Sequence, residues 1–184
     1  MQSTAKQATP RIDRLHRYWR KLAGQAFGEA DLSSRAAGGL SPAAPAVLPP
    51  PPRHLLDPAA IVDLLPHVLL AEFETAPFRV RYRLTGTRID EASGLNLTGT
   101  YLDEIDGGAS LAIFGPMIEN YRHCWQTGEA VIDFYEWTTQ NGRKMVICYG
   151  LFPLTIDGEI RQAIAIEEYD PSQDLDPLVP LHHR

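Results

Sequence analysis

Apolar and polar residues alternate without a break through the run FRVRYRLT, Phe78–Thr85. A period of two places successive side chains on opposite faces, so the run predicts a β-strand with one buried and one solvated face. Residues 68–74 (VLLAEFE) predict a preceding strand. Opposite charges on paired strands stabilise the pair, and we expect this between the acids and arginines Glu72, Glu74, Arg79, Arg81 and Arg83.

A helical period follows further along the chain. Leu111, Phe114, Ile118, Tyr121 and Trp125 recur at intervals of three and four, which predicts a long amphipathic helix that ends at Thr127-Gly128. Pro116 is expected either to kink this helix or to mark its true first turn. Between Gly86 and Gly108, the spacing of Gly94 and Gly99 indicates short helical pieces.

The last third of the chain predicts three strands, at residues 130–139, 144–154 and 160–168. Asn141-Gly142 and Asp157-Gly158 are typical of tight hairpins, because the central residues of such turns need positive φ. Two strands, short helices, one long helix and three strands define an α+β domain. We therefore predict a five-stranded antiparallel sheet with helices on one face.

Near the N-terminus, Thr9-Pro10 is typical of a helix start. Ile12, Leu15, Trp19 and Leu22 would then form one apolar stripe, and Gly24 and Gly28 are expected to loosen and end the helix. An Ala/Pro-rich segment follows. We predict an amphipathic helix at 1–29, a tether at 30–52, the compact domain at 53–170 and a tail at 171–184.

The chain resembles a proteobacterial PAS family of small stand-alone proteins, formerly a domain of unknown function. Three stretches carry the resemblance: RHLLDPAAIVDLLPHVLLAEFE (53–74), FRVRYRLTGTRIDEASGLNLTGTYLDEI (78–105) and LFPLTIDGEIRQAIAIEEYD (151–170), together with Tyr18-Trp19. The family's glycine, LTG and GT positions match Gly94, Leu97-Thr98-Gly99 and Gly86-Thr87. The resemblance implies a PAS fold and a role in sensing or regulation without catalysis.

A PAS domain also implies a cavity between its helices and the inner face of the sheet. On this chain the implied lining is Tyr82, Leu84, Phe114, Ile118, Tyr121, Cys148 and Ile164. The alternative is that these residues simply fill a dry core. Haem ligation by His123 or His67 is not expected, and covalent flavin chemistry is not expected because residues 94–102 contain no cysteine. No cofactor is required by the sequence.

Charge and composition narrow the possible partners. The net charge is −6, yet the first 22 residues contain six basic groups and one acid, so the body is more acidic than the total suggests. Phosphate binding needs positive potential, which argues against a nucleic-acid partner. The sequence has no apolar run long enough for a membrane span and no signal peptide, and its two cysteines form no metal or disulfide pattern; a cytoplasmic location is expected.

The function that these features predict is a non-catalytic regulator that acts through protein contacts, as a homodimer or with signalling proteins such as histidine kinases. The stripe of Ile12, Leu15, Trp19 and Leu22 would pack on the sheet or on a second copy, while its basic flanks could instead touch anionic lipid or an acidic partner. Two alternatives remain: a small-molecule sensor, and an enzyme. An enzyme would draw on the carboxylates Glu72, Glu74, Asp133, Glu136, Glu167 and Glu168, but no nucleophile–base pattern accompanies them.

Overall fold

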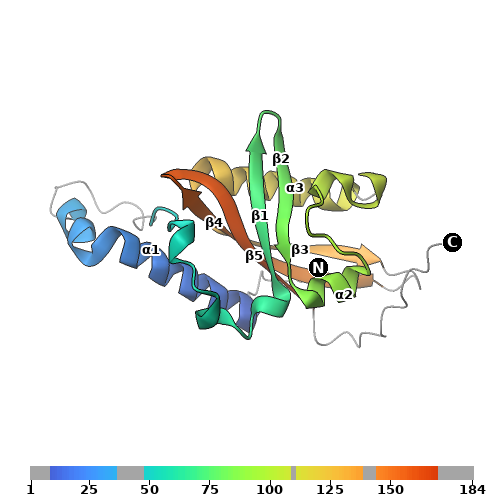
Figure 1. The fold of residues 1–184 in the computed structure, drawn as a ribbon, viewed down its shortest axis with the longest axis horizontal. Coiled ribbons are helices and arrows are strands. Elements are labelled where there is room, and N and C mark those ends of the chain that lie inside the picture. Colours follow the sequence, from blue (N-terminus) through green and yellow to red (C-terminus); the bar gives the residue numbers. More distant parts are fainter. Residues whose placement is uncertain (1–8, 37–47, 109–110, 139–143, 170–184) are drawn as a thin grey trace, which may run out of the picture.

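The structure is a computed structural model that describes residues 9–36, 48–108, 111–138 and 144–169 (Figure 1). Its main elements are α1 (Pro10–Ala36), β1 (Val68–Thr75), β2 (Phe78–Thr85), α2 (Thr87–Ser93), α3 (Leu111–Thr127), β3 (Val131–Thr138), β4 (Lys144–Ile156) and β5 (Glu159–Tyr169). Short 3-10 helices lie at Arg53–Leu55, Pro58–Ile61, Leu65–His67 and Leu102–Gly108.

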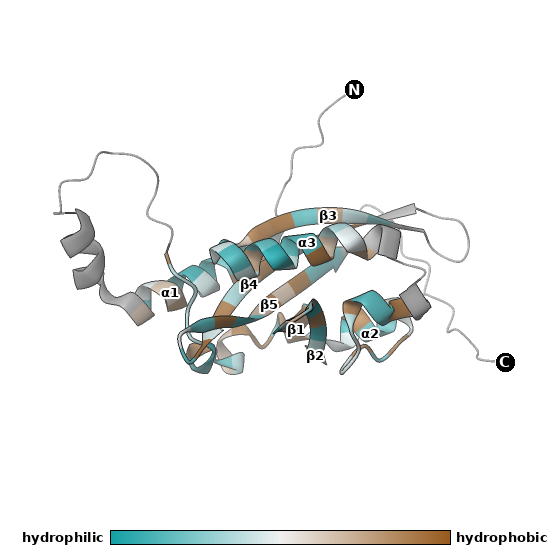
Figure 2. Ribbon diagram, turned by 90° about the horizontal axis from the view of Figure 1, so that it is seen from above, coloured by the Kyte–Doolittle hydropathy of each residue, from teal (hydrophilic) through white to brown (hydrophobic). Residues whose placement is uncertain are grey.

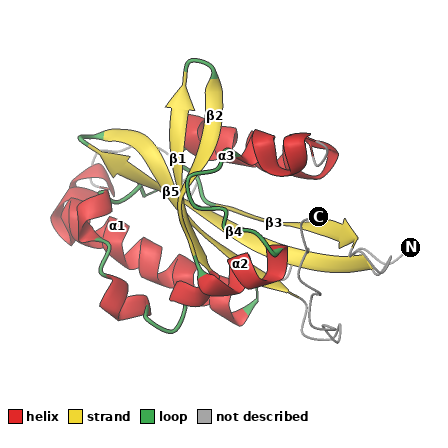
Figure 3. Ribbon diagram, turned by 45° about the vertical axis from the view of Figure 1, so that its right-hand side comes forward, coloured by secondary structure: helices red, strands yellow, loops and turns green. Residues whose placement is uncertain are grey.

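The five strands form one sheet in the order β2-β1-β5-β4-β3, and every neighbouring pair is antiparallel. The chain places α2 and α3 between β2 and β3, which is the order of elements that the PAS resemblance implies. The predicted α+β, PAS-like class is therefore confirmed. Helices cover both faces, however: α3 lies across one face and α1 lies along the other (Figures 1 and 3).

Two hydrophobic cores result, one on each face of the sheet. The inner core lies under α2, α3 and the 3-10 helix Leu102–Gly108. The outer core lies under α1, where the apolar stripe of the helix meets Phe152, Leu154, Ile164 and Ile166. Hydrophobic and hydrophilic bands alternate along the strands in Figure 2, as expected where successive side chains enter different surroundings.

The helix α1 begins where the sequence predicts and ends later. Its first turn starts at Pro10, and the backbone N–H of Asp13 donates to the Thr9 carbonyl at 2.9 Å. The expected end at Gly24 or Gly28 is wrong, because α1 continues to Ala36. A glycine inside a helix costs only about 1 kcal/mol relative to alanine, so neither glycine is sufficient to stop it.

The predicted boundary between tether and domain is also too late. Pro50 and Pro51 are buried, and the backbone N–H of Thr155 on β4 donates to the Pro51 carbonyl at 3.0 Å. Pro52 forms a bridge with the same residue. The proline run therefore docks on the sheet and belongs to the compact domain, a contact that composition alone does not reveal.

Two other turn predictions have clear outcomes. Asp157 and Gly158 both have positive φ, 51° and 83°, which confirms the β4–β5 hairpin. Asn141-Gly142 lies outside the described residues. Pro116 lies inside α3, which already begins at Leu111, so the prediction that it marks the first turn is wrong.

Candidate functional site

The structure separates the residues that the PAS resemblance placed together in one cavity. Tyr82, Phe114, Ile118 and Tyr121 lie in the inner core, as the resemblance implies. The remaining three, Leu84, Cys148 and Ile164, do not join them.

Cys148 and Ile164 belong to the outer core, under α1. Both lie on strands that are apolar on both faces, so hydrophobicity does not indicate which way they point. Leu84 is 49% exposed near the end of β2 and lines no core. The prediction that these three residues line one cavity with the other four is wrong.

The inner core contains a carboxylic acid, Glu167 on β5. Its residue exposure is 7%, and it is paired with Tyr149 in the β4–β5 ladder. Ala163 and Ala165 precede it at intervals of two, and both belong to the inner core. The signal in the sequence was therefore this alternation of small residues, which carries Glu167 inward beneath α3.

Tyrosine side chains from four different elements interact with this acid. We name the group the tyrosine–glutamate cluster, and its members are Glu167, Tyr82 (β2), Tyr121 (α3), Tyr135 (β3) and Tyr149 (β4). Tyr135 hydrogen-bonds to Glu167, and the rings of Tyr135 and Tyr149 have centroids 6.0 Å apart. The hydroxyl of Tyr82 faces the Met117 sulfur at 3.9 Å.

Burial controls the protonation of the cluster. It raises the pKa of Glu167 to about 7, although the hydrogen bond from Tyr135 acts in the opposite direction. Burial also raises the pKa of Tyr82 and of Tyr121 well above the ordinary tyrosine value, and that of Tyr149 to about 12. These three hydroxyls therefore stay neutral near pH 7, while Glu167 is partly protonated there.

Asn120 on α3 extends the cluster toward the surface. Its side-chain Nδ2 donates to the Tyr149 hydroxyl at 2.8 Å and to Oδ2 of Asp133 at 3.0 Å. Asp133 is half-buried on β3. One amide group thus ties α3 to both β3 and β4, and links a partly exposed carboxylate with the buried tyrosines.

On the outer face, α1 packs its stripe against the sheet of its own chain. Ile12, Leu15, Trp19 and Leu22 are all buried. The Trp19 indole Nε1 donates to the Pro153 carbonyl at 2.7 Å, which fixes the helix to β4. Of the two expected positions for this stripe, the chain's own sheet is the one observed, so the stripe is not available at the surface.

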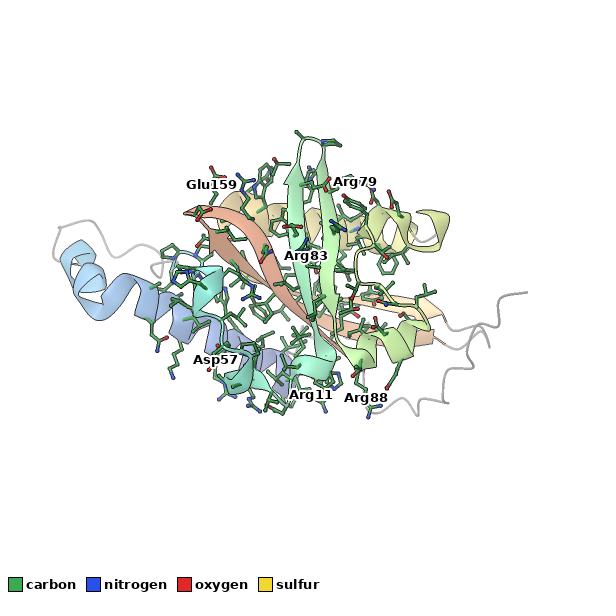
Figure 4. The ribbon with its side chains drawn as sticks, in the orientation of Figure 1. Arg11, Asp57, Arg79, Arg83, Arg88 and Glu159 are labelled. Atoms are coloured by element: carbon green, nitrogen blue, oxygen red, sulfur yellow. The ribbon has the colours of Figure 1, made fainter. Side chains whose placement is uncertain are left out.

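Charged groups hold the N-terminal part of α1 in place (Figure 4). Arg11 Nη1 contacts Oε1 of Glu168 at 2.6 Å, and the Glu168 side chain is only 10% exposed. Arg14 pairs with Asp63 at the surface. Arg17, Arg20 and Lys21 project from the exposed side of the helix. The outer side of α1 is therefore basic on a chain whose net charge is −6.

The histidines considered for haem lie elsewhere. His123 is half-exposed, with Nε2 at 3.2 Å from Oε2 of Glu129, so its side chain does not enter the inner core. His67 lies in the 3-10 helix before β1, and burial lowers its pKa. Among the described residues, no three His, Cys, Asp or Glu side chains are grouped closely enough to hold a metal ion.

Glu72 and Glu74, two of the carboxylates considered for catalysis, have structural partners. Glu72 pairs with Arg83 at 3.6 Å, and Glu74 accepts a hydrogen bond from the Tyr101 hydroxyl. Arg79 lies opposite Glu74 in the β1–β2 ladder, but its guanidinium binds Asp103 at 2.9 Å and Glu104 at 2.5 Å (Figure 4).

In the described part of the chain, no helix is long and apolar enough to cross a membrane.

Comparisons with known proteins give likeness of fold only. No family model matches the chain, and no curated protein matches it in sequence. Among solved structures, the VqmA dimer of Vibrio cholerae, a LuxR-type receptor, is similar at 17% identity and a TM-score of 0.47 over 62% of this chain and 50% of that one.

Two further structures show the same level of likeness. The PAS domain of an HTR-like protein from Haloarcula marismortui is similar at 12% identity and a TM-score of 0.41, over 61% of this chain and 91% of that one. The blue-light photoreceptor Vivid has 12% identity and a TM-score of 0.43 over 73% and 90%. At TM-scores below 0.5 these likenesses add no weight, so the PAS-like class rests on the element order and strand pairing.

Proposed function

We propose that this chain is a regulatory PAS module that works through protein contacts and performs no reaction of its own. The observation that carries the proposal is the docking of α1 on the outer face of the sheet, with its stripe buried and its basic side exposed. A flanking helix fixed in this way couples the domain core to a surface that partners can reach. Membership of the small proteobacterial PAS family is part of the same proposal.

The partner that we propose first is a second copy of the chain. Phe134 on the edge strand β3 is 44% exposed, and it lies opposite Cys148 of the outer core in the β3–β4 ladder. The outer face thus continues as an apolar surface beyond α1. A two-fold dimer would bury this patch twice, because both copies present the same surface. Signalling proteins such as histidine kinases are proposed as further partners.

Light scattering of the full chain over a range of concentrations tests the dimer. We expect a species of twice the chain mass of 20.5 kDa, and we expect Phe134→Glu to return it to the single-chain mass. Leu84→Glu is the matched control, since Leu84 is similarly exposed but lies on β2, the opposite edge strand. A single-chain mass at every concentration would contradict the homodimer.

A second candidate function is a small-molecule sensor, and the tyrosine–glutamate cluster favours it. Polar groups inside an apolar core are typical of sites that orient a ligand. Native mass spectrometry of the purified full chain tests this directly, because a retained molecule adds its mass to that of the chain. A spectrum with only the chain mass, before and after incubation with cell extract metabolites, would argue against this candidate.

We also propose a cytoplasmic location. Cys124 is a buried free thiol. A free cysteine is in keeping with a reducing compartment.

A further inference from the structure

Glu167 is exceptional among the buried polar groups of the described residues. Three polar or charged side chains are buried there, namely Gln162, Glu167 and Glu168. Glu168 has the guanidinium of Arg11 as its partner. Glu167 instead faces hydroxyl groups, with Tyr135 as its hydrogen-bond partner. In the described part of the chain, an ionised Glu167 would have the Tyr135 hydrogen bond but no opposite charge beside it.

We propose that the carboxyl group of Glu167 is a proton-binding site through which the packing of α3 on the sheet responds to pH near neutrality. In its protonated form the group is neutral and fits the apolar inner core. When the proton leaves to solvent, a negative charge remains beneath α3. No other reactant is needed, since the exchange involves only the carboxyl group and water.

Glu167 is the group of this cluster that titrates near neutral pH, as its neighbours on the packed elements indicate. Tyr135 on β3 hydrogen-bonds to it, and Tyr82 (β2), Tyr121 (α3) and Tyr149 (β4) interact with it electrostatically. Burial raises the pKa of these last three tyrosines above their ordinary value. Cys124 on α3 is nearby, with its thiol pKa raised to about 12 by burial. From β1 and Leu102–Gly108 the inner core receives the apolar side chains of Leu69, Ala71, Phe73, Leu102 and Ile105.

Asp133 is a second acid with a described link to the cluster, through Asn120. Its Oδ2 accepts from Asn120 Nδ2 at 3.0 Å, and the same amide donates to the Tyr149 hydroxyl. A charge on Glu167 would therefore act on a network that holds α3 to β3 and β4. The two α3 side chains in that network are Asn120 and Tyr121, so we expect α3 to be the element that loosens.

The direction of the effect follows from the two states of the chain. The pKa of Glu167 is about 7 when folded, against an ordinary value of 4.5 when exposed. Between these values the folded chain binds more protons than the unfolded chain, so stability falls as pH rises. Above about pH 7 the loss of stability is complete, and below about pH 4.5 there is no such loss.

The decisive experiment compares the full-length wild type with Glu167→Gln and with the matched control Glu168→Gln, which changes the adjacent and equally buried acid. Infrared difference spectra between about pH 5 and about pH 9 report the C=O stretch of a protonated carboxyl group. We expect the wild type and Glu168→Gln to lose a band with a midpoint near neutrality. We expect Glu167→Gln to lack that band.

Denaturant unfolding over the same range gives the second readout. Relative to Glu167→Gln, the unfolding equilibrium constant of the wild type should rise on the order of 100-fold between about pH 5 and about pH 9. Hydrogen exchange, corrected for intrinsic rates, should show the loss of protection concentrated in α3. A wild type and Glu167→Gln with parallel pH profiles, or a carboxyl band unaffected by Glu167→Gln, would overturn the proposal.

Tyr135→Phe keeps the test decisive if Glu167→Gln does not fold. The hydrogen bond from Tyr135 lowers the pKa of Glu167, so its removal should move the infrared midpoint to higher pH. A midpoint that stays in place or moves to lower pH would contradict the assignment of the band to Glu167.

Discussion

Glu167 and Glu168 are consecutive residues of β5, yet the two faces of the sheet treat them differently. Glu168 lies on the outer face, where Arg11 of α1 supplies a charge at 2.6 Å. Glu167 lies on the inner face, where tyrosines supply hydroxyls and burial raises its pKa to about 7. The charge of Glu168 is balanced by its ion pair with Arg11, whereas Glu167 loses its charge by binding a proton.

This difference reflects what each covering helix brings to its face. The helix α1 has basic side chains at the borders of an apolar stripe, so it can bury its stripe and still place a guanidinium beside an acid. The helix α3 presents Asn120 and Tyr121, which donate hydrogen bonds but carry no charge. The outer face should therefore depend on α1 as a structural element, and the inner face should be sensitive to pH.

The largest expected effect comes from Trp19→Ala on the outer face. Trp19 is buried and donates to the Pro153 carbonyl, so its truncation removes both packing and a hydrogen bond. We expect a loss of about 3–5 kcal/mol in the free energy of unfolding, measured by denaturant titration. Arg20→Ala, one residue away on the exposed side, should change it by no more than about 0.5 kcal/mol. Equal effects of the two variants would show that α1 is not docked.

The next effect concerns the ion pair itself. Arg11→Ala leaves the buried Glu168 carboxylate without its partner, and we expect a cost of about 1–3 kcal/mol. The added change Glu168→Gln should recover much of that loss, because a neutral amide needs no counter-charge. A double-mutant cycle measures the coupling. Arg14→Ala is the control, since its partner Asp63 is half-exposed, and we expect no more than about 1 kcal/mol there.

A smaller effect, of opposite sign, is expected at Gly24 within α1. Nothing lies within 4 Å of the position that a Cβ would occupy, so Gly24→Ala should stabilise the chain by about 0.5–1 kcal/mol. Thermal unfolding measures this gain. Gly86→Ala provides the contrast, because its Cβ would clash with the Pro66 carbonyl oxygen, and this substitution should destabilise the chain. A loss at Gly24 would indicate that the helix does not pass through it.

The smallest effect is a pH response of the outer face that opposes that of Glu167. His16 on α1 stacks on Phe152 with centroids 5.4 Å apart, and burial, followed by the charge of Arg20, lowers its pKa below 6.5. The folded chain then binds fewer protons than the unfolded chain, so stability is complete above about pH 6.5 and is lost as pH falls below it.

In thermal unfolding, His16→Gln should accordingly lose less stability on acidification than the wild type does. Because this trend runs against that of Glu167, the wild-type profile alone mixes two opposite contributions. The variant at each face separates them. An unchanged acid limb in His16→Gln would show that the histidine does not contribute.

Most of the elements could be predicted from the sequence, because their signals are local. The alternation in Phe78–Thr85, the helical period in Leu111–Thr127 and the Asp157-Gly158 turn each depend on a few neighbouring residues. The start of α1 at Pro10 is of the same kind. Local backbone preference and side-chain periodicity are sufficient for these features, and they also define the α+β class.

Only the tertiary structure decided which residues meet. The strands β4 and β5 are apolar on both faces, so their pattern does not say that Ile164 faces α1 or that Glu167 faces the tyrosines. The docking of α1 and the docking of the proline run likewise depend on contacts with the sheet. A side chain on a sheet covered by helices on both sides is buried either way, and its chemistry is determined by the helix above it and by the side chains beside it on the sheet.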